Sequence, residues 1–277
     1  MTSTSLIEAN GINLSVTVDG PEDGRPVLFL HGFPDSHYIW RHQVAALAAA
    51  GYRAIAVDQR GYGESDAPEG VDAYAIPNMA MDAAAVLDAL GIEQAAVVGH
   101  DWGASVAWLT ATLFPDRVER LVAISVGHPA AFFSAGGFQQ REKSWYMLFY
   151  QAEGTAEEWL SRDGFANLRA LAMDPVDFER NVADMSRPGR LTAGLNWYRA
   201  TTTAEAFAGP PLELPPVTCP TMGVWSSSDY ALTEVQMTAS ADHVTGPWRY
   251  ERIEGIGHDI PAAAPDQLNA LLLDFLA

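Results

Sequence analysis

The sequence has one cysteine, few basic residues and no long apolar run. Cys219 is the only cysteine in 277 residues, so the chain cannot form a disulfide bond within itself. Lysine and arginine number 16 against 35 aspartates and glutamates, which gives a formal net charge of −19 at pH 7. Nucleic acids and anionic membrane surfaces bind basic patches, so this charge argues against both classes of partner.

Neither a membrane span nor a secretory leader is recognisable. No apolar run approaches the roughly 20 residues that cross a bilayer. The first ten residues lack the basic segment and the apolar segment that a secretory signal combines. We therefore expect a cytoplasmic protein with no membrane partner.

The remaining composition is typical of a globular protein with a sizeable core. Apolar residues make up 48% of the chain and charged residues 18%. A length of 277 residues is long for one domain and short for two. It predicts a single domain that carries an insertion.

Short apolar runs alternate with helix-length segments along much of the chain. Residues 27–30 are apolar on both faces, as a central parallel strand requires. Residues 12–18 alternate between apolar and polar side chains, which predicts a half-buried strand near a sheet edge. Further strands are expected at 53–57, 95–98, 120–126, 221–225 and 249–253, and helices at 36–50, 76–90, 102–113, 232–242 and 266–276. The alternation predicts an α/β protein whose mostly parallel sheet is flanked by helices.

The strand rhythm stops after residue 127. Residues 128–214 contain helical stretches rich in aromatic side chains and no clear strand, and a proline-rich segment ends this region. We predict a core built from residues 1–127 and 215–277. The helical cap, residues 128–214, is predicted to be inserted after the sixth strand.

The segment Gly99-His100-Asp101-Trp102-Gly103 joins a predicted buried strand to a predicted helix. It fits the G-x-S-x-G pattern of a nucleophile turn, with aspartate in place of serine. Glycines on both sides let the strand and the helix approach closely around a strained residue. Asp101 is therefore the candidate nucleophile, and the alternative is that it only caps the helix beginning at Trp102.

Polar residues follow three other predicted strands. His31, Asp229 and His258 each lie just past the C-terminal end of a strand, as Asp101 does. In an open parallel sheet these ends converge on one crevice. The chain order of nucleophile, acid and histidine is that of α/β-hydrolase triads, which predicts the triad Asp101, Asp229 and His258. The alternatives are a helix-capping Asp229 and a structural loop histidine.

Over nearly its whole length the chain resembles the epoxide hydrolases of the α/β-hydrolase fold. The resemblance rests on His31-Gly32-Phe33-Pro34, Gly99-His100-Asp101-Trp102-Gly103, Ser228-Asp229-Tyr230, Gly257-His258 and two cap segments, 144–151 and 195–199. It implies that Tyr146 and Tyr198 bind the epoxide oxygen. It also implies that the backbone N–H groups of Phe33 and Trp102 form an oxyanion hole.

The resemblance assigns shaping roles to further residues. His31, Gly32 and Pro34 are expected to form the oxyanion turn without reacting. Trp145 and Trp197, next to the two tyrosines, are expected to line the substrate pocket. One departure is Asp259, because the residue after the catalytic histidine is often a bulky aromatic in this family. A carboxylate beside the catalytic histidine can perturb the protonation of that histidine, so the departure bears on the pH optimum more than on the type of reaction.

The implied reaction converts an epoxide and water to a vicinal diol. Asp101 would attack the epoxide to form an alkyl-enzyme ester while the tyrosines protonate the leaving oxygen. His258, oriented by Asp229, would then activate the water that hydrolyses the ester. No metal or organic cofactor is expected. The resemblance is compatible with a homodimer.

The nearest rival reading is a haloalkane dehalogenase, which shares the fold, the aspartate and the histidine. Such an enzyme needs N–H donors for the halide, and the candidates are Trp102, Trp145, Trp159 and Trp197. Phe33, at a position where a halide-binding asparagine often stands, and two tyrosines without a role argue against it.

Three more distant interpretations are disfavoured. A serine esterase is disfavoured because aspartate occupies the nucleophile position. A fluoroacetate-type dehalogenase usually has arginine where Trp102 stands. A non-catalytic binding protein of this fold is disfavoured because Asp101 and His258 are both present.

Overall fold

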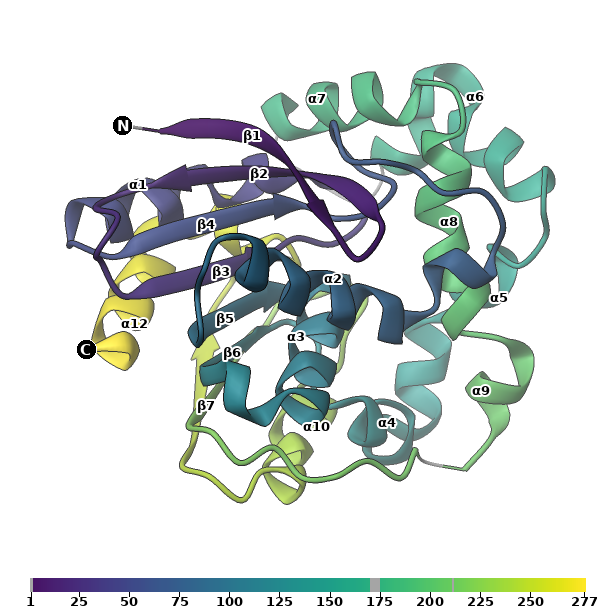
Figure 1. The fold of residues 1–277 in the computed structure, drawn as a ribbon. Helices are drawn as coiled ribbons and strands as arrows, with labels where there is room; N and C mark the ends of the chain where they lie inside the picture. Colours follow the sequence, from purple (N-terminus) through teal and green to yellow (C-terminus); the bar gives the residue numbers. More distant parts are fainter. Residues whose placement is uncertain (1, 170–174, 211) are drawn as a thin grey trace.

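The computed structural model describes residues 2–169, 175–210 and 212–277, and Figure 1 shows their arrangement. Residues 170–174, within the predicted cap, and residue 211, in the predicted proline-rich segment, lie outside the described residues. The described part forms one β-sheet with helices packed against it. None of its helices is both long and apolar enough to cross a bilayer.

Eight strands of the described chain form a single sheet in the order β1-β2-β4-β3-β5-β6-β7-β8. In chain order they are β1 (Ser3–Ala9), β2 (Ile12–Asp19), β3 (Pro26–Leu30), β4 (Arg53–Asp58), β5 (Ala95–His100), β6 (Val118–Ile124), β7 (Thr221–Ser226) and β8 (Trp248–Ile253). β2 pairs antiparallel with β1 and β4, and every other neighbouring pair is parallel. The predicted mostly parallel sheet is confirmed.

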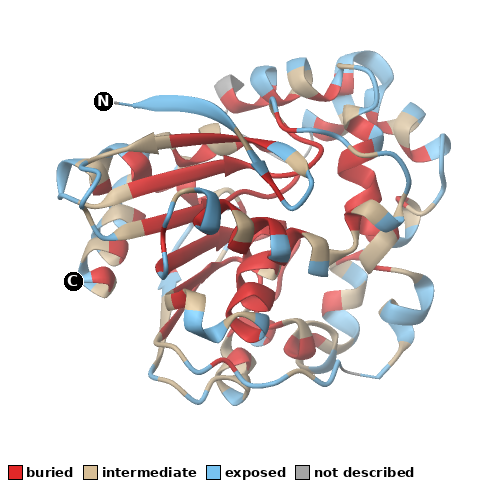
Figure 2. Cartoon of the chain, in the orientation of Figure 1, coloured by how far each residue is buried: buried red, intermediate tan, exposed pale blue. Residues whose placement is uncertain are grey.

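The central strand β3 shows why its sequence is apolar throughout. Leu28 and Leu30 pack into the core on one face of the sheet, and Val27 and Phe29 pack into the core on the other. Successive side chains of a strand point to opposite faces, so both faces of β3 must be covered. Figure 2 shows the buried residues gathered in the central strands and on the inner sides of the helices.

Strand β1 was absent from the prediction. It pairs with β2 along its whole length, but most of its side chains are exposed (Figure 2). An edge strand of this kind is held by backbone hydrogen bonds, so its sequence need not show an apolar periodicity.

The helices of the core cover both faces of the sheet. They are α1 (Arg41–Ala49), α2 (Ile76–Ala89), α3 (Trp102–Leu113), α10 (Glu234–Thr238), α11 (Ile260–Ala263) and α12 (Pro265–Leu276). α1 and α12 belong to one core cluster, whereas α2, α3 and α10 belong to the other. The helix expected at 232–242 is instead the short α10 followed by a 3-10 turn, Ala239–His243.

The chain between β6 and β7 is helical wherever the structure describes regular structure in it. Its helices are α4 (Pro129–Lys143), α5 (Trp145–Phe149), α6 (Thr155–Arg169), α7 (Pro175–Met185), α8 (Arg190–Thr201) and α9 (Ala204–Ala208). Helices α5 to α8 lie beyond the carboxyl ends of the parallel strands (Figure 1). The predicted insertion after the sixth strand is confirmed, whereas the cap borders at residues 128 and 214 stay a prediction.

Candidate active site

Asp101 occupies the tight turn between β5 and α3. Its backbone has φ 53° and ψ −124°, a conformation that residues with a Cβ atom rarely adopt. A Cβ on Gly99 would collide with the carbonyl of Gly103, and a Cβ on Gly103 would collide with that of Leu30. The two glycines therefore let the strand and the helix meet around a strained residue. The Asp101 side chain makes no capping hydrogen bond to α3, so the structure does not support the helix-cap alternative.

The turn after β3 holds one oxygen of this carboxylate. The backbone N–H of Phe33 donates to Asp101 Oδ1 at 2.9 Å. A Cβ at Gly32 would collide with the Asp101 side chain, so only glycine leaves room for the nucleophile here. Pro34 follows through a cis peptide bond and has no N–H to offer.

His31, the residue before this turn, fixes it through hydrogen bonds of its ring. It is completely buried, its Nε2 accepts the Gln59 N–H at 3.0 Å, and its Nδ1 lies 2.8 Å from the Gly32 carbonyl. Nδ1 is therefore the nitrogen that carries the proton. Burial lowers the pKa of His31 to about 4, so the ring is neutral and has a structural role.

The three predicted triad residues meet at the carboxyl ends of β5, β7 and β8. His258 Nδ1 donates to Asp229 Oδ2 at 2.8 Å, and His258 Nε2 lies 3.3 Å from Asp101 Oδ2. The N–H groups of Ala231 and Leu232 donate to the other oxygen of Asp229 at 2.8 and 2.9 Å. Asp229 is therefore fixed by its own loop and orients the histidine.

Hydrogen bonds hold the backbone of His258 as well as its ring. Its carbonyl oxygen accepts a hydrogen bond from His100 Nε2 at 2.9 Å and another from the Ser125 hydroxyl at 3.2 Å. Burial lowers the pKa of His100 to about 4, so this ring is a neutral donor. His100, the last residue of β5 and the neighbour of Asp101, thus joins β5 to the loop that carries His258.

The charges of the triad stabilise one another. Burial would raise the pKa of Asp101, but the hydrogen bond and charge of His258 outweigh it, so that pKa lies below its usual value. Burial would likewise lower the pKa of His258, but Asp229 and Asp101 hold it well above its usual value. At neutral pH the site therefore holds an ionised Asp101 beside a protonated His258.

Three tyrosines gather near this carboxylate, namely Tyr146 of α5, Tyr150 directly after α5 and Tyr198 of α8. The Tyr198 ring lies 6.0 Å from Tyr146 and 5.0 Å from Tyr150, measured between ring centroids. Burial, with the Asp101 charge as a second cause, raises the pKa of each tyrosine above its usual value. The raised pKa values keep the hydroxyls protonated at neutral pH, and none of the three has a hydrogen-bond partner among the described residues, so each is available as a donor.

The two tryptophans that are predicted to line the pocket differ in their surroundings. Trp145 is 55% exposed, and its recorded ring contact is with Phe149, on the same helix. Adjacent helical positions point about 100° apart, so α5 turns Trp145 outward when it turns Tyr146 inward. Trp197 has no accessible surface and donates its indole N–H to the Arg60 carbonyl at 3.2 Å. These positions do not support a wall of the substrate pocket at either tryptophan, and their pocket role stays a prediction.

Trp102 contributes to the site through both its indole ring and its backbone N–H. Its indole ring is buried and lies edge-on to Tyr198, with ring centroids 5.0 Å apart. Its backbone N–H contributes to the low pKa of Asp101. The structure thus brings Trp102 and Phe33 together at the carboxylate, where the sequence predicts an oxyanion hole.

Two acidic residues beside the triad had no assigned role in the sequence-based site. Burial raises the pKa of Asp259 to about 6, and burial together with Asp259 holds the pKa of Asp35 well above its usual value. Asp35 Oδ1 accepts a hydrogen bond from the Asn181 amide at 2.8 Å. The sequence signal that could have assigned them to the site was position, because Asp35 directly follows the oxyanion turn and Asp259 directly follows the triad histidine.

Two tyrosines were also missed. Tyr150 lies four residues after Tyr146, a spacing that places both on one side of a helix. Tyr230 follows the triad acid, and its ring lies 5.6 Å from that of His258.

One set of potential metal ligands overlaps the triad. His100, His258 and Asp259 offer ligand atoms within 4.8 Å of one another. Both ring nitrogens of His258 already face triad carboxylates, and His100 Nε2 donates to the His258 carbonyl. We therefore assign these groups to the triad and its support.

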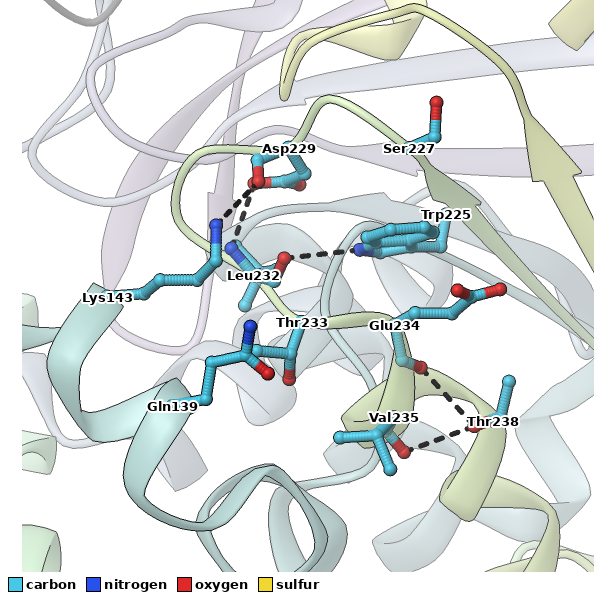
Figure 3. Close-up of a pocket in the computed structure, with 10 residues that line it drawn as sticks. All are labelled: Gln139, Lys143, Trp225, Ser227, Asp229, Leu232, Thr233, Glu234, Val235 and Thr238. Carbon is cyan, nitrogen blue, oxygen red and sulfur yellow. Dashed lines mark hydrogen bonds between the residues drawn. The ribbon is translucent and has the colours of Figure 1, made fainter.

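A groove of about 520 Å³ lies beside the loop that carries Asp229 (Figure 3). Its walls come from α4, β7, the Asp229 loop and α10, and Lys143 reaches from α4 toward that loop. Asp101 and the cap tyrosines are not among its lining residues. The groove therefore lies behind the triad acid and is separate from the nucleophile.

Comparisons with known proteins agree with this architecture. The family model of the α/β hydrolase fold matches residues 25–260, a range that contains Asp101, Asp229 and His258. Epoxide hydrolase A of Mycobacterium tuberculosis is 35% identical, over 98% of this chain and 96% of its own length.

Solved structures show the same similarity. One comes from work on epoxide hydrolases in metagenomes from hot environments. It has a TM-score of 0.88 and 31% identity, covering 100% of this chain and 99% of its own. An epoxide hydrolase of Bacillus megaterium, in complex with an inhibitor, has a TM-score of 0.89 and 28% identity, covering 98% of this chain and 99% of its own.

Proposed function

This chain belongs to the α/β-hydrolase fold family, and we propose that it is an epoxide hydrolase, which converts an epoxide and water to a vicinal diol. The observation that carries the proposal is the environment of the Asp101 carboxylate. Phe33 N–H binds Oδ1 at 2.9 Å, and His258 Nε2 lies 3.3 Å from Oδ2. Similarity to epoxide hydrolases along nearly the whole chain supports the choice of substrate.

In the first step, Asp101 Oδ2 attacks a carbon of the epoxide ring. A C–O bond of the ring breaks, and an ester joins Asp101 to the substrate. The leaving oxygen is an alkoxide, which is basic enough to take a proton from a tyrosine even when burial has raised the tyrosine pKa. Tyr146 and Tyr198 supply the hydroxyls, of which one transfers its proton and the other stabilises the oxygen.

In the second step, His258 removes a proton from water. Formation of the ester abolishes the charge of Asp101, which is one of the causes that keep His258 protonated. The pKa of His258 therefore falls when the ester forms, so the imidazolium releases its proton to solvent and the neutral ring becomes a base. Asp229 orients it and stabilises the imidazolium that results.

Hydroxide then attacks the Asp101 carbonyl carbon. The N–H groups of Phe33 and Trp102 hold the resulting oxyanion at Oδ1. Collapse breaks the bond between the carbonyl carbon and Oδ2, and the departing diol oxygen takes the proton from His258. The proton left on the Asp101 carboxyl returns through solvent to the tyrosine. His258 takes up a proton from solvent once Asp101 is ionised again, which restores the enzyme.

Haloalkane dehalogenation is the second candidate. The structure weakens it, because Trp145 faces solvent and the Trp197 N–H is bound to a backbone carbonyl. Of the four tryptophans proposed as halide donors, only Trp102 and Trp159 remain. A cytoplasmic location and a homodimer stay predictions from the sequence.

The test is turnover of styrene oxide and simple alkyl epoxides, with 1-bromobutane in parallel. We expect diol and no halide. A single turnover in H₂¹⁸O is expected to place label on Asp101 and to give an unlabelled diol, because the new diol oxygen comes from Oδ2. Halide release without diol would replace the proposal by the dehalogenase, and label appearing directly in the first diol would exclude the ester.

A further inference from the structure

Helix α4 binds the loop that carries Asp229 through hydrogen bonds of one buried glutamine. Gln140 Nε2 donates to the Ala231 carbonyl at 2.9 Å and to the Ser144 hydroxyl at 2.9 Å. Gln140 Oε1 accepts the backbone N–H and the hydroxyl of Thr233, both at 2.9 Å. The side chain is completely buried, and these four bonds use both donors and both acceptor sites of the amide.

The loop that Gln140 holds is the loop that shapes Asp229. Ala231 presents its carbonyl to Gln140 and its N–H to Asp229 Oδ1, so one peptide segment connects the two side chains. Leu232, between the two residues that Gln140 contacts, donates the second hydrogen bond to Asp229 (Figure 3). A shift of this segment must move the carboxylate that orients His258.

Two further features of α4 serve the same contact. Lys143 Nζ donates to the backbone carbonyls of Asp229 and Tyr230 at 2.9 and 3.0 Å, from the wall of the groove (Figure 3). A Cβ at Gly136 would collide with the side chain of Gln140, four residues later in the same helix, so glycine leaves the room that this side chain occupies. The contact is therefore built from several residues of one helix.

We propose that Gln140 is a positioning residue that couples helix α4 to the triad through the Asp229 loop. It touches neither substrate nor the reacting atoms, and it acts on His258 only through Asp229. Ester formation depends on Asp101, Phe33 and the tyrosines, whereas ester hydrolysis depends on a correctly oriented His258. Gln140 therefore sets the rate of the second step and leaves the first unchanged, an inference that rests on the two-step mechanism proposed above.

The test is rapid-quench measurement of a single turnover, in which ester formation and ester decay are followed separately by protein mass. In Gln140→Leu we expect ester decay to slow by roughly 10- to 100-fold, the usual effect of a small misplacement of catalytic groups. Ester formation should stay within about twofold of wild type. Gln139→Leu is the matched control, because Gln139 is the adjacent glutamine of α4 and is exposed.

Two more variants keep the test decisive if Gln140→Leu does not fold. Gln140→Glu keeps acceptor atoms for Thr233 but loses both donors, and it should slow decay by less than Gln140→Leu. Lys143→Met removes the half-exposed contact and should also slow decay selectively. Wild-type decay in these variants, or equal slowing of both steps, would overturn the inference. Diol formation by wild type without any ester would overturn the mechanism instead, and the inference with it.

Discussion

Replacing Asp259 by asparagine removes the carboxylate that stands next to the triad histidine. Burial raises the pKa of Asp259 from 3.8 to about 6, against the opposing effect of His258. A folded-state pKa above the unfolded value means that ionisation of Asp259 disfavours the folded protein. The penalty is absent below the unfolded pKa, grows as pH rises toward about 6, and is then constant.

The size of this penalty follows from the shift. A difference of about two pKa units corresponds to about 3 kcal/mol at most. Asparagine has nearly the same shape and no charge, so Asp259→Asn should be more stable than wild type above about pH 6, by up to that amount. At about pH 4 the two proteins should unfold with nearly equal free energies.

The same substitution should move the pH dependence of catalysis. The charge of His258 lowers the pKa of Asp259, so the charge of Asp259 must raise the pKa of His258 by the same interaction. His258 must be neutral to accept a proton from water. Asp259→Asn should therefore shift the acidic limb of ester hydrolysis to lower pH.

Urea unfolding between about pH 4 and pH 8 and single-turnover pH profiles check both effects. Asp116→Asn, at an exposed aspartate far along the chain from the triad loops, is the control and should change neither. A stability difference that does not grow with pH, or an acidic limb that stays in place or moves to higher pH, would refute the reasoning.

Three other substitutions test separate parts of the site. Tyr146→Phe combined with Tyr198→Phe should reduce the rate of ester formation by at least roughly 100-fold, because neither position then has a hydroxyl to protonate the alkoxide. Stopped-flow fluorescence measures this rate, with Tyr150→Phe as the comparison variant. A near-normal rate in the double variant would assign the acid to another residue. His258→Gln should form the ester and retain it, which mass spectrometry detects as a stable adduct; an adduct that decays at the wild-type rate would remove His258 from the second step. Gly103→Ala should lower the free energy of unfolding by roughly 1–3 kcal/mol, because the alanine Cβ would collide with the Leu30 carbonyl. Urea unfolding measures this, and a stability equal to wild type would show that strand and helix can separate there without cost.

Local sequence signals predicted much of the framework. The helix expected at 102–113 coincides with α3, because Gly103 and Asp101 mark its beginning and Pro115 forbids its continuation. The central strands were found from short apolar runs, which a sheet covered on both faces requires. Strand β1 escaped because its exposed side chains carry no such signal.

The site was predictable where residues follow strand ends, and less so in the cap. Asp101, Asp229 and His258 meet because parallel strands deliver their C-terminal ends to one edge of the sheet. The orientation of α5 was not predictable in the same way. A five-residue helix made of large apolar and aromatic side chains has no charged face to show which way it turns, so the exposure of Trp145 could not be predicted.

The sequence by itself determined the alternation of the central strands with the core helices, the turn at Asp101 and the place of each triad residue after a strand, because each of these depends on residues that are close together in the chain. Only the tertiary structure decided that Asp259 lies near enough to the buried Asp35 to raise its pKa and that Gln140 holds the loop of Asp229. Burial energies and complete hydrogen bonding arise between segments that are distant in the chain, so they exist only once the sheet and the helices have packed.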